Sequence, residues 1–264
     1  VDFVELPAAV QTAAMAEYFG AIVSEGEEQV EACGSPGETG NVAALGHRYK
    51  AWISETDDGS RGLDAAYTSE NGKSMVHTML ALNAPDQLRQ RVAWALSQTW
   101  VVGEIGLQSY ASENEIWHAY YDIFVRHAFG NLFDVMREVS FSPAMGIYLT
   151  LVDATAISVD GSVPDENYAR EIMQLFTIGL FELKMDGTRE RDASGAHIPT
   201  YSTEQILSFA RAWTGLTRQS PRTNIERVSK GGPARNNVDP MRFVPTWRDP
   251  LPKMDLHHGY IGDH

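Results

Sequence analysis

What this 264-residue sequence lacks already narrows the classes of protein to which it can belong. Its single cysteine, Cys33, excludes a disulfide within the chain and leaves the redox compartment open. No run approaches the roughly 18 to 20 apolar residues of a membrane-spanning helix. Basic residues number 21 against 35 acidic ones, and the formal net charge of −14 argues against nucleic acid or an anionic membrane surface as the main partner.

The motifs of several enzyme classes are also missing. The sequence has no P-loop, no G-x-G-x-x-G, no G-x-S-x-G and no H-E-x-x-H. Asp-Gly pairs at 58–59, 160–161 and 186–187 lack the remaining ligand positions of an EF-hand loop and indicate turns. We therefore expect no cofactor, and the motifs leave enzymatic activity undecided.

What is present predicts a mainly α, multi-helix single domain with one small β-hairpin and long irregular arms. Apolar residues recur at helical spacing, and Asp186–Gly187 and Gly195 mark the turns of the hairpin. We expect a helical domain over 1–216 and an irregular C-terminal arm over 217–264. Because the chain opens without an initiator Met and stops abruptly, we expect it to be a piece of a longer protein. The predicted helices cover 7–23, 85–102, 112–130, 131–151 in two pieces, 165–178 and 202–216.

The helices at 85–102 and 202–216 each have predicted core residues. In the helix at 85–102 the stripe is Leu88, Val92, Leu96 and Trp100. In the helix at 202–216, Ser202 with Gln205 three residues later forms a capping box. Its expected core residues are Ile206, Phe209, Ala210 and Trp213. The tryptophans and tyrosines of the helices are interpreted as core, namely Trp94, Trp100, Trp117, Tyr120, Tyr121 and Trp213.

The stretch "PDENYAREIMQLFTIGL", residues 164 to 180, is unusual because its helix carries two organised faces. Pro164 and Asp165 suit the first turn of a helix, where a missing N–H costs little and a carboxylate suits the helix dipole. The predicted helix, from about Asp165 to Ile178, is therefore expected to be a central element. Its apolar side comprises Tyr168, Ile172, Leu175, Phe176 and Gly179.

The second face of this helix brings together Asn167, Arg170, Glu171 and Gln174, the candidate catalytic residues. These side chains could hold a polar substrate or orient a water molecule. The alternative is a buried polar network that fixes one helix against another. In either case Arg170 should meet a carboxylate, with Glu166, Glu171 and Glu204 as the candidates.

Histidines offer one weak candidate metal site. The tail "DLHHGYIGDH" contains Asp255, His257, His258, Asp263 and His264, which have the chemistry of metal ligands, although paired histidines in a terminal loop are more often exposed. His118 and His127 lie nine residues apart, which is not ligand spacing on one helix face. His127 is interpreted as a cation at a helix C-terminus or a capped core histidine.

Several segments in order resemble one protein family. They are "APDQLRQRVAWALSQTWVV", "HAFGNLFDVMREVSFSPAMGIYL", "PDENYAREIMQLFTIGLFEL", "IPTYSTEQILSFARAWTGL" and "NNVDPMRFVP". From about Ala84 to Lys253 the chain resembles the bacterial domain-of-unknown-function family numbered 1800. The resemblance implies a largely helical protein, usually exported, without a settled activity. The family favours Asn where Asp165 stands, and a His-Asp pair where this chain has Arg248–Asp249, which weakens a metal or acid–base role for that loop.

Two functional hypotheses follow. In the first, the chain is a scaffold or interaction subunit of a larger extracytoplasmic assembly, with protein partners and no transmembrane segment. In the second, it is an exported enzyme that acts on a polymer or polar substrate through the polar face of helix 165–178. A cleft of ligand size at that face would favour the second hypothesis.

Overall fold

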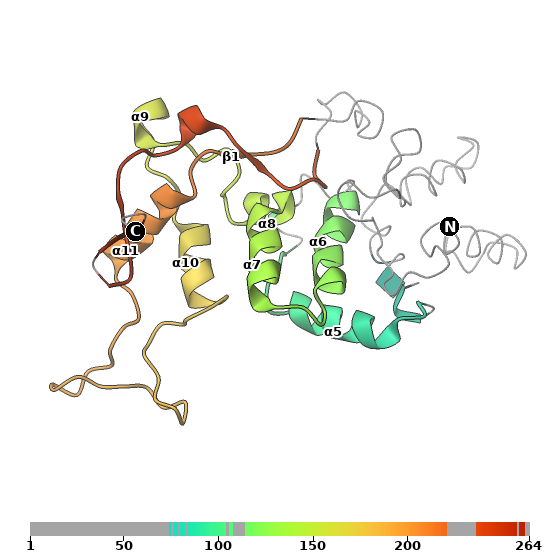
Figure 1. The fold of residues 1–264 in the computed structure, drawn as a ribbon, viewed down its shortest axis with the longest axis horizontal. Coiled ribbons are helices and arrows are strands. Elements are labelled where there is room, and N and C mark those ends of the chain that lie inside the picture. The colour runs from blue at the N-terminus through green and yellow to red at the C-terminus, as the bar shows by residue number, and fades with distance from the viewer. Residues whose placement is uncertain are drawn as a thin grey trace, which may run out of the picture. The chain divides into compact units, whose positions relative to one another are not determined.

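The computed structural model confirms the predicted mainly α fold with small β elements (Figure 1). It describes residues 74, 77–78, 80–82, 84–103, 106–107, 114–220, 236–257 and 259–261. The helix predicted at 7–23, the loop at 24–70 and Cys33 lie outside these residues. The elements belong to two compact units, the first comprising Val1–Met145 with Arg218–Pro240, and the second Gly146–Thr217 with Met241–His264.

In the first unit, α6 (Asn114–Arg126) contacts both α5 (Gln87–Ser97) and α7 (Leu132–Phe141). Aromatic residues fill the space between them. The rings of Trp100 and Phe124 stack with centroids 6.2 Å apart, and Tyr120 meets Phe124 edge-on at 5.3 Å. Tyr120 also donates a hydrogen bond to the carbonyl of Trp100, at 2.5 Å, so the core fixes the chain just beyond α5.

The buried side of α5 differs from the predicted stripe. Gln90, Ala93 and, beyond the helix, Trp100 are buried, whereas Leu88 and Trp94 are exposed. The stripe was therefore wrong for Leu88, and the interpretation as core was wrong for Trp94. The buried side of α5 is displaced because a polar residue, Gln90, takes part in it. Gln90 can be buried because its Nε2 donates to both carboxylate oxygens of Asp86 at 3.3 Å. Hydrophobic patterning assigns such a glutamine to the surface.

After α7 the chain enters α8 (Pro143–Tyr148), which leads from the first unit into the second. Two helical pieces were predicted over 131–151, and the structure separates them at Ser142, with α8 beginning at Pro143. In the second unit α10 (Asn167–Gln174) packs on α11 (Thr203–Ala212), with the short α9 (Ile157–Asp160) preceding them. Their shared core consists of Ala169, Met173, Ile206 and Ala210, with Ile172, Tyr201, Phe209, Trp213 and Leu256 packed against it.

The start of α11 follows the predicted capping box. The Ser202 hydroxyl accepts from the Gln205 backbone N–H at 3.3 Å, and the Gln205 side chain accepts from the Ser202 N–H at 2.7 Å. Two orphan donors of the first turn are thereby satisfied. Because Tyr201 precedes the cap and packs against a cluster that contains Ile206, it also acts as a hydrophobic staple.

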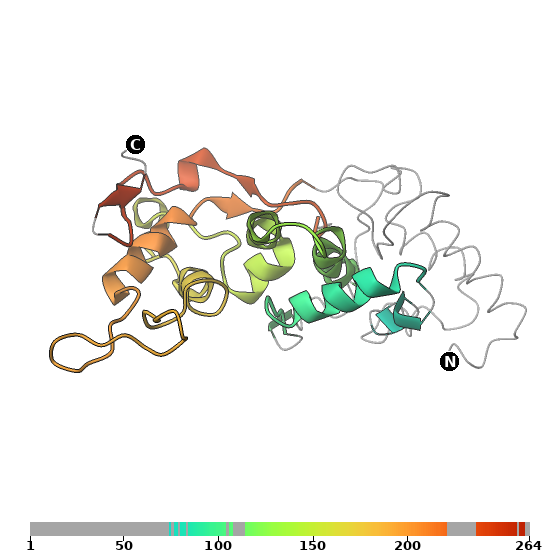
Figure 2. The ribbon, with the colours of Figure 1, turned by 60° about the horizontal axis from the view of Figure 1, so that its bottom comes forward.

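Residues 180–200, called here the arm, form the predicted hairpin region. Gly187 and Gly195 have φ of +81° and +88°, as the turns require, and the bridges Leu183–Arg189, Arg191–His197 and Phe181–Pro199 tie the strands together. Figures 1 and 2 both show the arm extending away from α10 and α11.

The predicted C-terminal arm is shared between the units, since its described residues 218–220 and 236–240 belong to the first unit and those from 241 onward to the second. There β1 (Leu216–Thr217) pairs with β2 (Arg242–Phe243), and the 3-10 turn η3 (Pro245–Trp247) follows. The antiparallel pair β3 (Lys253–Met254) and β4 (Tyr260–Ile261) lies against α11 through β3. Met241 is buried, and its side chain fills the space in which Gly146 has no Cβ.

Candidate functional site

The predicted polar face lies on α10, which is shorter than expected. Arg170 was predicted to meet a carboxylate, and its partner is Glu166, one of the three candidates. The Nη2 atom of Arg170 lies 2.8 Å from Glu166 Oε1. The two side chains are 37% and 42% exposed, so this pair is not a buried network. Asn167 is exposed and its Nδ2 donates to Thr150 Oγ1 at 3.3 Å, while Gln174 is half-buried.

Glu171 is the member of this face with the most unusual surroundings. Its Oε2 is buried and has no hydrogen-bond partner among the residues that the structure describes, and the same holds for the hydroxyl of Tyr201 just before α11. Burial raises the pKa of Tyr201; the charge of Arg170 lowers it and that of Glu171 raises it. Arg170, Glu171 and Tyr201 therefore lie close enough to interact electrostatically.

This trio can accept a hydrogen bond at a carboxylate and offer or accept one at a phenol. An unpaired buried polar atom costs free energy, and it needs an explanation when it occurs in a folded protein. Sequence reasoning did not include Tyr201. The capping box at Ser202 could have indicated it, because the residue before an N-cap often packs against the helix as a hydrophobic staple. Here Tyr201 packs against a cluster that also contains residues of α10.

The predicted metal ligands of the tail are only partly described. Asp255 Oδ1 accepts the backbone N–H groups of His257 and Gly259, at 2.7 and 2.8 Å, and so closes a tight turn. His257 is exposed, and His258, Asp263 and His264 lie outside the described residues. Within the described residues no group of three or more His, Cys, Asp or Glu side chains could hold a metal ion.

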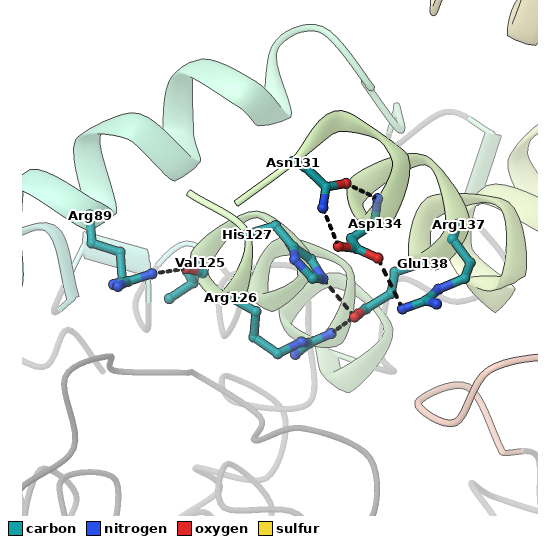
Figure 3. A network of polar contacts seen from close by, with 8 residues as sticks. All are labelled: Arg89, Val125, Arg126, His127, Asn131, Asp134, Arg137 and Glu138. Atoms are coloured by element: carbon teal, nitrogen blue, oxygen red, sulfur yellow. Dashed lines mark hydrogen bonds and ion pairs between the residues drawn. The ribbon is translucent and has the colours of Figure 1, made fainter. Parts of the chain in front are cut away.

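A second polar constellation occurs in the first unit at the α6–α7 corner, residues 126–138 (Figure 3). Arg126 and His127, at the end of α6, both point at Glu138 of α7. The distances are 2.5 Å from Arg126 Nη2 to Glu138 Oε2 and 2.7 Å from His127 Nε2 to Glu138 Oε1. The expectation of a histidine at a helix C-terminus is confirmed, whereas its partner Glu138 was not foreseen.

The neighbourhood of Glu138 favours its charged form. Burial of this carboxyl raises its pKa, but the charge of Arg126 and hydrogen bonds from Arg126 and His127 lower it, and the pKa lies below its ordinary value of 4.5. Asn131 caps α7 by accepting the Asp134 N–H at 3.0 Å, and Arg137 pairs with Asp134 at 3.2 Å. Glu138 thus joins α7 to the end of α6, while Asn131 and Arg137 hold Asp134 within the first turns of α7.

Large apolar side chains are exposed at the same corner. Phe129, Leu132 and Phe133 all face solvent, within five residues of chain. Arg89 of α5 supports the turn, since its Nη1 donates to the carbonyl of Val125 at 2.9 Å and its guanidinium lies 5.1 Å from the centre of the Phe129 ring. Exposed phenylalanines on a turn fixed in this way are typical of interaction surfaces.

Comparison with known proteins places this chain in a family. The sequence model of the family described as "Protein of unknown function (DUF1800)" matches residues 7–261. No curated protein and no solved structure matches. In the part of the chain that the structure describes, no helix is both long and apolar enough to cross a membrane.

Proposed function

We propose, from the premise that this chain belongs to the DUF1800 family, that it is a scaffold or interaction subunit of a larger extracytoplasmic assembly. The observation that carries the proposal is the arm of residues 180–200. Met185 at its first turn is fully exposed, and Leu183 and Leu180 on the same arm are also exposed. A monomeric protein gains nothing in stability from presenting such side chains to water.

The arm is built to hold those side chains in place. At its first turn, Asp186 Oδ1 accepts from the Thr188 N–H and hydroxyl, at 2.9 and 2.6 Å. At its second turn, Asp192 Oδ1 accepts from Ser194 and Ala196 N–H groups, at 2.8 and 3.0 Å. A partner that binds a preorganised arm loses less conformational entropy than one that must order it.

Arm and corner share the composition of protein interfaces. Methionine, aromatic residues and arginine are enriched at the centres of such interfaces. The arm presents Met185 and an Arg189 guanidinium 4.5 Å from the centre of the Phe181 ring, and the corner presents Phe129 and Phe133. The extracytoplasmic location is supported by the family resemblance, and fractionation of the full-length protein in its source cells would test it.

Site-specific photo-crosslinking tests the interaction role. A photoreactive residue replaces Met185 in the full-length protein, expressed in its source cells, and Ser162, an exposed polar residue of the same unit, serves as the matched control position. We expect a defined protein adduct from position 185 and none from 162. A protein that gives no adduct at 185, 129 or 133 and has the mass of one chain in native mass spectrometry would contradict the proposal.

A second candidate function is an exported enzyme that acts on a polar substrate through the α10 face. The unpaired Glu171 Oε2 and the unpaired Tyr201 hydroxyl favour it, because functional groups are often held at a cost in stability. The melting temperature of a Glu171→Met variant tests this second function. A rise in stability would favour a functional role for Glu171, and a loss would favour a structural one.

A further inference from the structure

A groove runs along α11 in the second unit, on surfaces that belong to neither the arm nor the corner. It has a volume of about 500 Å³, within the range of small-molecule sites. Its lining includes Ser208 and Met254 together with three large side chains, the wall residues Leu207, Leu251 and Tyr260. The three wall residues are exposed although each is large and apolar.

The groove has a fixed shape because side chains of α11 bind the backbone of the segment opposite. Gln205 Nε2 donates to the carbonyl of Asp255 at 2.9 Å. Ser208 Oγ accepts from the Met254 N–H at 2.6 Å, and Arg211 donates to the carbonyl of Pro252. One edge of β3 is held in this way by the helix, while β4 pairs with its other edge.

Two residues of opposite charge, near the two ends of α11, line the groove. Glu204 lies in the first turn of α11 and Arg211 in the last, and both line the groove. Seven residues of helix separate them, which is about 10.5 Å along the axis and too far for a mutual ion pair. Among the described residues neither side chain has an ion-pair partner of its own.

The helix dipole accounts for part of this arrangement. An acidic residue in the first turn and a basic one in the last are both favoured by it. The dipole does not account for the exposed Leu207, which lies between the two charges on α11, or for the exposed Leu251 and Tyr260, which line the same groove. An apolar surface with one charge of each sign at its ends is complementary to a ligand that is apolar in the middle and carries the reverse charges.

We propose that this groove binds a short peptide with free termini and apolar side chains. The α-amino group lies at Glu204, the α-carboxylate at the Arg211 guanidinium, and the apolar side chains against Leu207, Leu251 and Tyr260. Three residues of extended chain span about 10 Å, at roughly 3.3 Å per residue. This length equals the separation of the two charged positions, so the groove selects a tripeptide or a compound of the same length and charge.

Isothermal titration calorimetry with the tripeptide Ala-Leu-Leu and the whole 264-residue chain tests the proposal. The wild-type protein is titrated with the free peptide, its N-acetyl form and its C-terminal amide. We expect each blocked form to bind about tenfold more weakly than the free peptide, the factor that 1.4 kcal/mol represents. Equal affinity for all three forms, or no heat of binding for the free peptide, would overturn the proposal without any change to the protein.

Variants then assign each terminus to its residue. Glu204→Gln should weaken binding of the free peptide about tenfold and leave binding of the N-acetyl form unchanged. Arg211→Gln should also weaken binding of the free peptide about tenfold, but leave binding of the C-terminal amide unchanged. Asp165→Asn and Arg242→Gln remove exposed charges of the same unit that lie outside both the groove and the arm, and circular dichroism confirms that all four variants fold. If the controls weaken binding as much as the groove variants, general electrostatics explains the affinity and the assignment is wrong. None of these residues carries the proposed interaction role of the arm, so either proposal can fail alone.

Discussion

Two arginine–glutamate pairs differ in how much water reaches them. Arg170 and Glu166 lie on the same helix with 37% and 42% of their side chains exposed. Arg126 and Glu138 join two helices with 13% and 27% exposed, and His127 shares the carboxylate. Exposed i,i+4 pairs contribute only about 0.3–0.5 kcal/mol, whereas a charge left unpaired in a buried site is costly.

The two arginines should therefore respond differently to the same substitution. We expect Arg170→Met to change the free energy of unfolding by less than about 1 kcal/mol, and Arg126→Met to lower it by about 1–3 kcal/mol. Chemical denaturation of both variants measures the difference. An Arg170→Met variant as destabilised as Arg126→Met would mean that the α10 face is a buried structural network after all.

Glu138 should make stability depend on pH in the acidic range. Its pKa in the folded protein is below 4.5, so the folded state binds fewer protons than the unfolded state near that pH. The contribution of Glu138 is therefore complete above about pH 4.5 and is lost as the pH falls through the lowered folded-state pKa.

The measurement compares the wild type with Glu138→Gln between pH 6 and 3. The difference between their unfolding free energies should shrink on acidification. In an Arg126→Met background the same substitution should show a weaker pH dependence, because the charge of Arg126 is the main cause that lowers the pKa. A difference independent of pH would show that Glu138 acts only through packing.

Glu171 should behave in the opposite way to Glu138. Its buried Oε2 has no partner, so Glu171→Met removes an unsatisfied atom and keeps the side-chain volume. We expect the melting temperature to rise, with a gain of about 0.5–2 kcal/mol, as is common where a functional group is replaced. A loss of stability on this substitution would assign Glu171 to a structural role and remove the enzymatic alternative's main support.

At the scale of the helix, α10 shows which part of its packing the sequence could predict. Tyr168 and Phe176 are buried as expected, but Leu175 is 61% exposed and was wrongly assigned to the core. The buried side is instead centred on Ala169 and Met173, which contact Ile206 and Ala210 of α11. A small residue allows another helix to approach closely, and hydrophobicity patterns give such an alanine little weight.

This shift in the buried side yields a matched pair of substitutions. Met173→Ala removes a side chain that is 4% exposed and should cost about 2–4 kcal/mol. Leu175→Ala, at the C-cap of α10, should cost less than about 0.5 kcal/mol, as substitutions at exposed positions usually do. Thermal unfolding of the two variants decides the matter, and equal losses would refute the observed orientation of α10.

Local signals predicted other elements well because their cause is local. The capping box of α11 involves only Ser202 and Gln205, and the hairpin turns need only Gly187 and Gly195. By contrast, Glu138 lies twelve residues from Arg126, and Leu251 and Tyr260 reach α11 from far along the chain. Such pairings depend on the tertiary fold, so no spacing rule reveals them.

At the scale of the whole molecule, the second unit depends on the end of the chain. A protein that stops after Thr217 would lack β2, which pairs with Leu216 and Thr217, and β3, which covers α11. It would also lack the buried Met241. We expect the truncated protein to lose protease resistance across α10 and α11, while the 264-residue chain keeps it. A resistant α10–α11 fragment at low protein concentration would show that these helices fold without the later strands.

The division of the two units along the chain also bears on how the protein is made. The first unit takes up residues 218–240, where the Asn236 side chain donates to the carbonyl of Ser220, only after the main part of the second unit has been synthesised. The second unit then waits for residues 241–264. Neither unit has all of its residues while the ribosome is still translating α11, although domains generally fold in order from the N-terminus. A premature stop codon before residue 218 would therefore remove part of both units at once, whereas one after residue 240 would shorten the second unit alone.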